Sequence, residues 1–174
     1  MSSSFYISDI QDVTVKNSFF LCNQGKTGSA LDIKSFKTFL NHNSSFTQNR
    51  ATQKGGSISL KLGYIVKISN CNFRNGSANE GADIFVEKVS FLLSISSLYK
   101  SGKSEYSGGA LLIDSVKIIK LVICSFMRSF SKFAGGAVYI SKCQNVLILN
   151  CHFSENFAEM GGACYVKDVK YVQE

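Results

Sequence analysis

The sequence predicts an all-β protein that folds as a right-handed parallel β-helix, a solenoid of about six coils with three short strands in each. A glycine junction recurs every 26 or 27 residues, at Gly28, Gly55, Gly81, Gly108, Gly135 and Gly161. A second landmark recurs with nearly the same period, at Phe20, Phe46, Phe73, Leu98, Phe126 and Phe153. Between the landmarks apolar and polar residues alternate, which is the period of a β-strand.

The first strand of each coil follows the glycine junction. Its inward positions are small or apolar in every coil, at Leu31, Ile58, Ile84, Leu111, Val138 and Cys164. The next position, which points outward, is polar in two coils and then large and apolar in four, at Phe85, Leu112, Tyr139 and Tyr165. Exposed contiguous apolar surface often marks a binding site, so these four residues are the candidate contact face. Stacked aromatic side chains also stabilise sheets, and a purely structural role stays open.

The second strand follows a polar turn, and its inward column is predicted to be Val13, Phe39, Val66, Phe91, Ile119 and Val146. The next inward column is predicted to include Leu93. An asparagine bend follows at Asn17, Asn43, Asn70 and Asn150, because asparagine tolerates the left-handed backbone conformation. The third strand then carries the phenylalanine landmark, preceded two residues earlier by Ser18, Ser44, Cys71, Ser96, Cys124 and Cys151. A glycine-rich, polar loop is expected to return to the next junction.

A unit of about 27 residues with three short strands cannot cover its own apolar face, so neighbouring units must stack on it. Stacking places like residues above like residues, roughly 4.8 Å apart, on parallel strands. Crossovers between parallel strands are nearly always right-handed. We therefore expect residues 1–174 to form a single β-helix domain that is a segment of a longer solenoid.

Composition narrows the classes of function. The chain carries 19 basic and 12 acidic residues, a net charge of +7, but no run of four or more basic residues. Nucleic-acid binding is therefore not expected. No stretch reaches the roughly 18 apolar residues that cross a membrane, so no transmembrane segment is expected in this chain, and residues 1–5 lack the pattern of a signal peptide. No cofactor is expected.

Two motifs together resemble the repeats of the chlamydial polymorphic outer membrane proteins, whose fold is pectin-lyase-like. The motifs are Gly-Gly-Ala followed by an aliphatic residue, and Phe-x-x-Asn, as in Phe153–Asn156. The match extends over nearly the whole chain, with Gly76, Ser101 and Ser129 in place of the asparagine in the third, fourth and fifth coils. The resemblance implies an extracellular or cell-surface location and an adhesive role.

The resemblance favours a non-enzymatic structural or adhesive segment that binds a protein or a glycan through the candidate contact face. Two alternatives stay open: a polysaccharide lyase or hydrolase, and a module that assembles end to end through the open ends of the solenoid. Such catalysis needs acids that converge on one groove. Asp32 and Asp83 are expected to face outward but lie two coils apart, so no catalytic residues are assigned.

The cysteines are expected to be free, buried thiols. Cys124 and Cys151 would stack at the strand spacing, which is longer than the Cβ separation of a typical disulfide. The sequence has no Cys-x-x-Cys pair, and His42 and His152 do not share a column, so no metal site is expected. Asn75-Gly-Ser matches the N-glycosylation pattern in a loop. Asn43-Ser-Ser also matches, but Asn43 is expected to be inaccessible within the asparagine bend.

Overall fold

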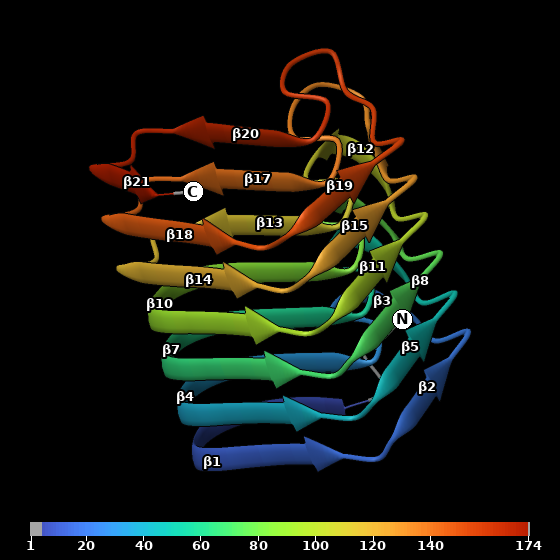
Figure 1. Ribbon diagram of the computed structural model, residues 1–174. Helices are drawn as coiled ribbons and strands as arrows, with labels where there is room; N and C mark the ends of the chain where they lie inside the picture. Colours follow the sequence, from blue (N-terminus) through green and yellow to red (C-terminus); the bar gives the residue numbers. More distant parts are fainter. Residues whose placement is uncertain (1–4, 174) are drawn as a thin grey trace.

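The computed structural model describes residues 5–173, in which the regular structure consists of β-strands. The coils stack from β1 at the bottom to β20 and β21 at the top (Figure 1). The near strands β14 and β18 run to the right and the far strands β13 and β17 run to the left as the chain rises (Figure 1). The path is therefore right-handed, and the predicted parallel β-helix of about six coils is confirmed.

The largest sheet contains the first and second strands of every coil, all paired in parallel. In the first four coils one long strand passes through the corner between the two predicted strands, whereas in the later coils it is divided in two. Its strands are β1 (Phe5–Lys16), β4 (Leu31–His42), β7 (Ile58–Ser69), β10 (Ile84–Ile95), β13 (Leu111–Asp114), β14 (Ile118–Val122), β17 (Val138–Ser141), β18 (Asn145–Leu149), β20 (Cys164–Lys167) and β21 (Tyr171–Gln173).

The second sheet carries the phenylalanine landmark. Its strands are β2 (Phe19–Leu21), β5 (Ser45–Thr47), β8 (Asn72–Arg74), β11 (Leu98–Lys100), β15 (Ser125–Met127) and β19 (His152–Ser154).

A third sheet lies where the sequence predicted only a returning loop, and that prediction is wrong. Its strands are β3 (Gln24–Thr27), β6 (Arg50–Lys54), β9 (Ser77–Glu80), β12 (Lys103–Ser107) and β16 (Phe130–Ser131). Their buried inward positions hold only small residues, namely Gly25, Ala51, Ala78, Ser104 and Ser131. The sequence therefore lacked the large apolar alternation that marks a buried strand.

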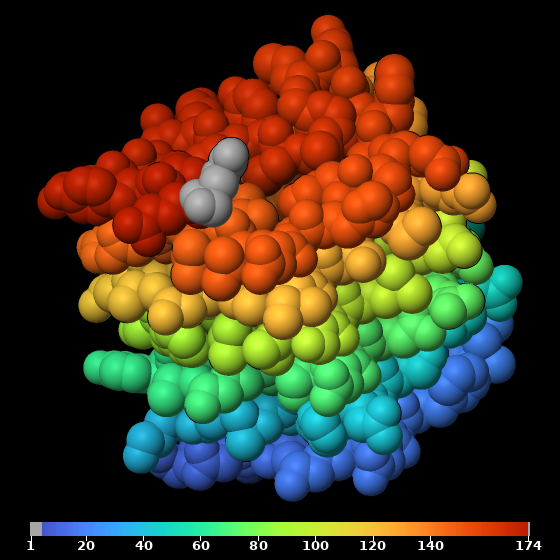
Figure 2. Space-filling model, viewed as in Figure 1, coloured from blue at the N-terminus to red at the C-terminus, as the bar shows by residue number. Residues whose placement is uncertain are grey.

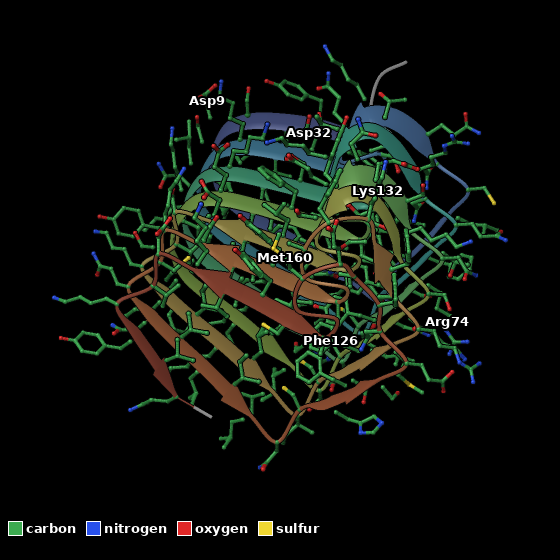
Figure 3. All side chains as sticks on the ribbon, turned by 90° about the horizontal axis from the view of Figure 1, so that it is seen from above. Asp9, Asp32, Arg74, Phe126, Lys132 and Met160 are labelled. Carbon is green, nitrogen blue, oxygen red and sulfur yellow. The ribbon has the colours of Figure 1, made fainter. Side chains whose placement is uncertain are left out.

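A ladder of aromatic rings fills the core beneath the second sheet. Successive rings stack with centroids 4.7 to 5.0 Å apart, in the order Phe20, Phe46, Phe73, Tyr99, Phe126 and Phe153. Seen from above, Phe126 lies inside the coil whereas Arg74 points away from it (Figure 3). The ladder residue of the fourth coil is Tyr99, so the prediction of Leu98 is wrong. The Ser94 and Tyr99 hydroxyls lie 2.8 Å apart in a buried hydrogen bond.

The prediction for the fourth coil is wrong by one residue along much of its length. Leu92 and Ser94 face the core, whereas Phe91 and Leu93 point outward. The small residue before the ladder is likewise Ser97 rather than Ser96, since the Ser97 hydroxyl accepts a hydrogen bond from the Cys71 amide. A shift of one residue exchanges the two faces of a strand. Polar core residues made the wrong alignment look more apolar than the correct one.

The bend between the first and second sheets requires a left-handed backbone at one position in each coil. This position has φ between 49° and 52° and is occupied by Asn17, Asn43, Asn70, Ser96, Ile123 and Asn150. The predicted asparagine bend is therefore confirmed at all four predicted asparagines. Ile123 is β-branched, a residue type for which this conformation is strained, and its side chain is 55% exposed.

Replacing Ile123 by asparagine should stabilise the protein by about 1 kcal/mol, because a left-handed conformation costs most side chains about 1–2 kcal/mol. The exposed isoleucine side chain contributes little packing to offset this gain. Urea unfolding followed by circular dichroism measures the change. The matched control is Asn150→Ile, which should lower the unfolding free energy by a similar amount. If Ile123→Asn were neutral or destabilising, the strain assigned to Ile123 would be wrong.

Candidate contact groove

A shallow groove of about 410 Å³ runs along the outward side of the first strands β10, β13, β17 and β20. Its floor comes from β10, β13 and β17, which place Phe85, Leu112 and Tyr139 side by side in register. One wall comes from the ends of third-sheet strands, where Lys54 and Glu80 lie. The other wall comes from the corner between the first and second strands. The groove therefore has an aromatic and aliphatic floor between charged walls.

The structure places the four predicted contact residues at different depths. Phe85 and Leu112 are only 1% and 6% exposed, so the expectation of an exposed apolar face is wrong for these two. Two lysines from lower coils cover the ring of Phe85: the Nζ atoms of Lys54 and Lys61 lie 4.4 Å and 5.4 Å from its centre. Tyr139 and Tyr165 are half-buried and stack with centroids 5.4 Å apart. The contact role of all four residues stays a prediction.

Two ion pairs and two hydrogen bonds engage charged groups in the walls. Lys54 Nζ lies 2.9 Å from a carboxylate oxygen of Glu80. Asp114 accepts hydrogen bonds of 2.6 Å from the Ser141 hydroxyl and 2.9 Å from the Ser115 hydroxyl, and Lys142 Nζ lies 3.9 Å from it. Ion pairs this exposed contribute little stability. Their main effect is to hold polar groups in fixed positions along the groove.

Asp83, which was expected to face outward beside Asp32, is fully buried, so that prediction is wrong. It occupies the third position of the glycine junction, where four of the other coils have alanine. Gly76 and Gly102 stand beside it. A Cβ atom built on Gly76 would lie 2.1 Å from one Asp83 carboxylate oxygen, and one on Gly102 would lie 3.1 Å from the other. The Asp83 carboxyl therefore occupies space that the two glycines leave.

Other coils fill the equivalent space with an asparagine from the Phe-x-x-Asn motif. Asn49 donates a 3.1 Å hydrogen bond to the Phe20 carbonyl and accepts one of 3.0 Å from the Asn23 amide. Near the C-terminal end of the solenoid Asn156 makes the equivalent pair of bonds. It donates to the Phe126 carbonyl and accepts from the Ser129 amide. Alignment by the aromatic ladder shows that Gly102, not Ser101, replaces this asparagine in the fourth coil. In the third and fourth coils the Asp83 carboxyl thus replaces the asparagine side chain. The pairing of Gly76 and Gly102 with one aspartate at a junction was the sequence signal that could have revealed this replacement.

The environment of Asp83 disfavours its charged form. Neither carboxyl oxygen has a hydrogen-bond partner of good geometry in the described part of the chain. Burial raises the pKa of Asp83 well above its usual range, and the nearby Gly76 amide opposes this only in part. Burying an unpaired, ionised carboxylate costs free energy, and the group avoids this cost by taking up a proton.

The thiols lie in the core and at one surface corner. Cys22, Cys71, Cys124, Cys143 and Cys151 are free thiols, as expected. Burial is confirmed for Cys71, Cys124 and Cys143, whereas Cys22 is exposed, so the expectation that it is buried is wrong. Cys124 and Cys151 stack in adjacent coils, where a hydrogen bond from the Cys151 thiol lowers the pKa of Cys124 and raises that of Cys151. Burial raises the pKa of Cys143 to about 11.

The two glycosylation patterns lie at exposed corners. Asn75 is exposed, with a left-handed φ of 53°, and its modification stays a prediction. Asn43 is also exposed, so the expectation that it is inaccessible is wrong. Its side-chain amide donates a 2.8 Å hydrogen bond to Asn17. Stacking at the bend therefore leaves these asparagine side chains at the surface.

Within residues 5–173, no cluster of three or more histidine, cysteine or acidic side chains is placed to hold a metal ion. The same part of the chain has no helix of the length and apolarity needed to cross a membrane.

Asp83 should make stability depend on pH. Because its pKa is raised on folding, the folded chain binds the proton more tightly than the unfolded chain. The contribution is complete below the unfolded pKa, at about 4, and is lost as pH rises through the folded pKa. Asp83→Asn cannot ionise, so it should be more stable than the wild type at pH 7, with each tenfold difference in proton affinity worth about 1.4 kcal/mol.

Urea unfolding at intervals between pH 4 and 8 tests this expectation. Glu105→Gln is the matched control, because Glu105 is exposed on β12 and its loss should leave the pH profile parallel to that of the wild type. An Asp83→Asn profile that also ran parallel to the wild type would contradict the burial of an ionisable Asp83.

Comparison with known proteins gives one match to a family. The model of the Chlamydia polymorphic membrane protein repeat matches residues 43–61. This segment contains both sequence landmarks, Phe46–Asn49 and the junction at Gly55, and it ends within β7. No curated protein and no solved structure matches the chain. The predicted resemblance is therefore confirmed at the level of this repeat: the chain is a β-solenoid of about six coils, one segment of which is similar to the Chlamydia polymorphic membrane protein repeat.

Proposed function

We propose that this chain is a non-enzymatic, adhesive segment of a surface-located β-helix protein, and that it binds a glycan in the contact groove. The match to a membrane-protein repeat supports the surface location. The groove supports the binding role. Its combination of an apolar floor and fixed polar walls is the observation that carries the proposal.

A glycan fits this groove because sugars present both apolar ring faces and many hydroxyl groups. Tyr139 supplies aromatic surface at the upper end of the floor, and Tyr165 stacks on it beyond the groove. Aromatic side chains carry a large share of binding energy at interfaces. The carboxylates and ammonium groups along the walls supply hydrogen bonds for hydroxyl groups. Binding sites commonly combine an apolar lining with a few fixed polar groups.

The contacts of the carboxylates favour binding over cleavage. A glycosidase needs one carboxyl group as an acid and a second as a nucleophile or base. In this groove Glu80 is paired with Lys54, and Asp114 accepts two serine hydroxyl hydrogen bonds. Both carboxylates are therefore already engaged by neighbouring side chains of this chain, as polar groups in a binding wall would be.

The double substitution Tyr139→Ser with Tyr165→Ser should weaken glycan binding at least tenfold, because it removes the stacked aromatic surface at the upper end of the groove. A glycan array identifies a ligand for the wild type, and isothermal titration then measures the change in Kd. The control is Phe130→Ser with Phe157→Ser, an exposed stacked pair on the third-sheet side with centroids 5.8 Å apart. This control should leave Kd unchanged.

Three outcomes would count against the proposal. If the tyrosine variant bound as tightly as the wild type, the groove would not be the site. If only protein ligands competed for the tyrosine surface, the partner would be a protein. Release of new reducing or unsaturated ends from a bound polysaccharide would show that the chain is an enzyme.

A further inference from the structure

The outward side of the second strands forms a broad apolar surface on the side of the core opposite the groove. It is the near surface in the left half of Figure 2, where each coil appears as one coloured layer. We call it the second-strand face, and it consists of three outward columns. Their members from β4 to β21 are Thr38, Ile65, Phe91, Ile118, Asn145 and Tyr171; then Leu40, Lys67, Leu93, Lys120, Leu147 and Gln173; then His42, Ser69, Ile95, Val122 and Leu149.

Large apolar side chains dominate this face although they point away from the core. Ile118 and Leu149 are 38% and 41% exposed, and Ile65, Phe91, Leu93, Ile95, Val122 and Leu147 are half-buried against one another. The sequence analysis did not predict this surface, because its one-residue misalignment of the fourth coil placed Phe91 and Leu93 in the core. An apolar area of this extent on a surface commonly marks an interaction site.

Positive charge is interleaved with the apolar residues. In the middle column Lys67 and Lys120 alternate with leucines and are exposed. Neither lysine takes part in an ion pair within residues 5–173. From β4 to β21 no aspartate or glutamate occupies an outward position on the described second strands. On β1 the columns continue with Asp12 and Lys16, whose charges offset each other, so Lys67 and Lys120 stay unbalanced. The face therefore combines apolar contact area with unbalanced positive charge.

The corner that borders this face has the composition of a membrane interface. One column along it contains Lys37, Tyr64, Lys117 and Lys170, all exposed. Tyr64 is 67% exposed, and Tyr171, beside Lys170, is 59% exposed. Tyrosine is enriched where proteins meet lipid headgroups. Lysine can lay its apolar stem on a hydrocarbon surface while its ammonium group stays in water. The same corner has a position with a left-handed backbone in each coil, and this position is acidic at Asp9 in the first coil and at Asp168 in the last.

We propose that the second-strand face binds the surface of a lipid bilayer that contains anionic headgroups. The apolar columns would enter the headgroup region, and the lysines would pair with lipid phosphates. Lysines near such a surface attract anionic lipid, and apolar residues add area-dependent affinity. A second copy of this chain fits less well, because two such faces would bring uncompensated lysines together.

Sedimentation with vesicles tests this proposal on the 174-residue chain. The protein should bind vesicles of phosphatidylcholine with phosphatidylglycerol much more strongly than vesicles of phosphatidylcholine alone. Raising the salt concentration to about 0.5 M should release most of it, because salt screens exposed charges. The partition coefficient is read from the bound fraction at several lipid concentrations.

Matched variants locate the binding surface. Lys67→Gln with Lys120→Gln should lower the partition coefficient for anionic vesicles roughly 25-fold, because each lysine near the surface is worth about fivefold. The control Lys103→Gln with Lys132→Gln removes the same charge from exposed positions on the third-sheet side and should change binding less than about threefold. Likewise Ile118→Ser with Leu149→Ser should weaken binding, whereas Phe130→Ser with Phe157→Ser should not. Circular dichroism confirms that each variant keeps its strands.

The proposal fails if the chain binds neither kind of vesicle, or if it binds both kinds equally. It also fails if the two lysine pairs have equal effects, since binding would then reflect net charge alone. Self-association that Lys67→Gln with Lys120→Gln strengthens would assign the face to a second copy instead.

Discussion

Every coil of this protein must place its backbone in register above the coil before it. The hydrogen bonds that hold the coils together run along the axis of the solenoid, as between the Ala110 amide and the Ala137 carbonyl at 2.8 Å. The aromatic rings stack at 4.7 to 5.0 Å because that is the spacing of neighbouring strands. Each position in a coil therefore belongs to a column, and its residue must fit the residues above and below it.

This constraint explains how much of the fold the sequence could predict. The period, the first-strand columns and the asparagine bend were predictable because a column repeats one chemical requirement in every coil. The fourth coil was misaligned because its core holds Ser94 and Tyr99, which satisfy each other through one hydrogen bond. Periodicity treats a polar residue as outward, and only the three-dimensional partner shows otherwise. The third sheet was missed for the related reason that its inward residues are small.

The same reasoning applies to the site. Phe85 and Leu112 were correctly placed on the outward side of the first strands, but their exposure depended on side chains from other strands. Lys54 covers the ring of Phe85 from a different sheet, and no column of the sequence joins these two residues. Asp83 shows the converse case, in which loss of a side chain at Gly76 and Gly102 makes room for a carboxyl from another column. Contacts between columns were therefore the part of the structure that the sequence could not supply.

Charge is distributed unevenly around the solenoid, and this distribution links the proposed roles of the contact groove and the second-strand face. Four acidic residues and three lysines line the groove, so its charges nearly balance, whereas the second-strand face from β4 to β21 carries lysines without acids. The two surfaces belong to one bent sheet and lie on opposite sides of the core, with β13 and β17 behind β14 and β18 (Figure 1). An anionic bilayer would therefore attract the second-strand face more strongly than the groove. A chain that lay on such a bilayer through its second strands would therefore present its groove away from the lipid, where a glycan could reach Tyr139 and Tyr165.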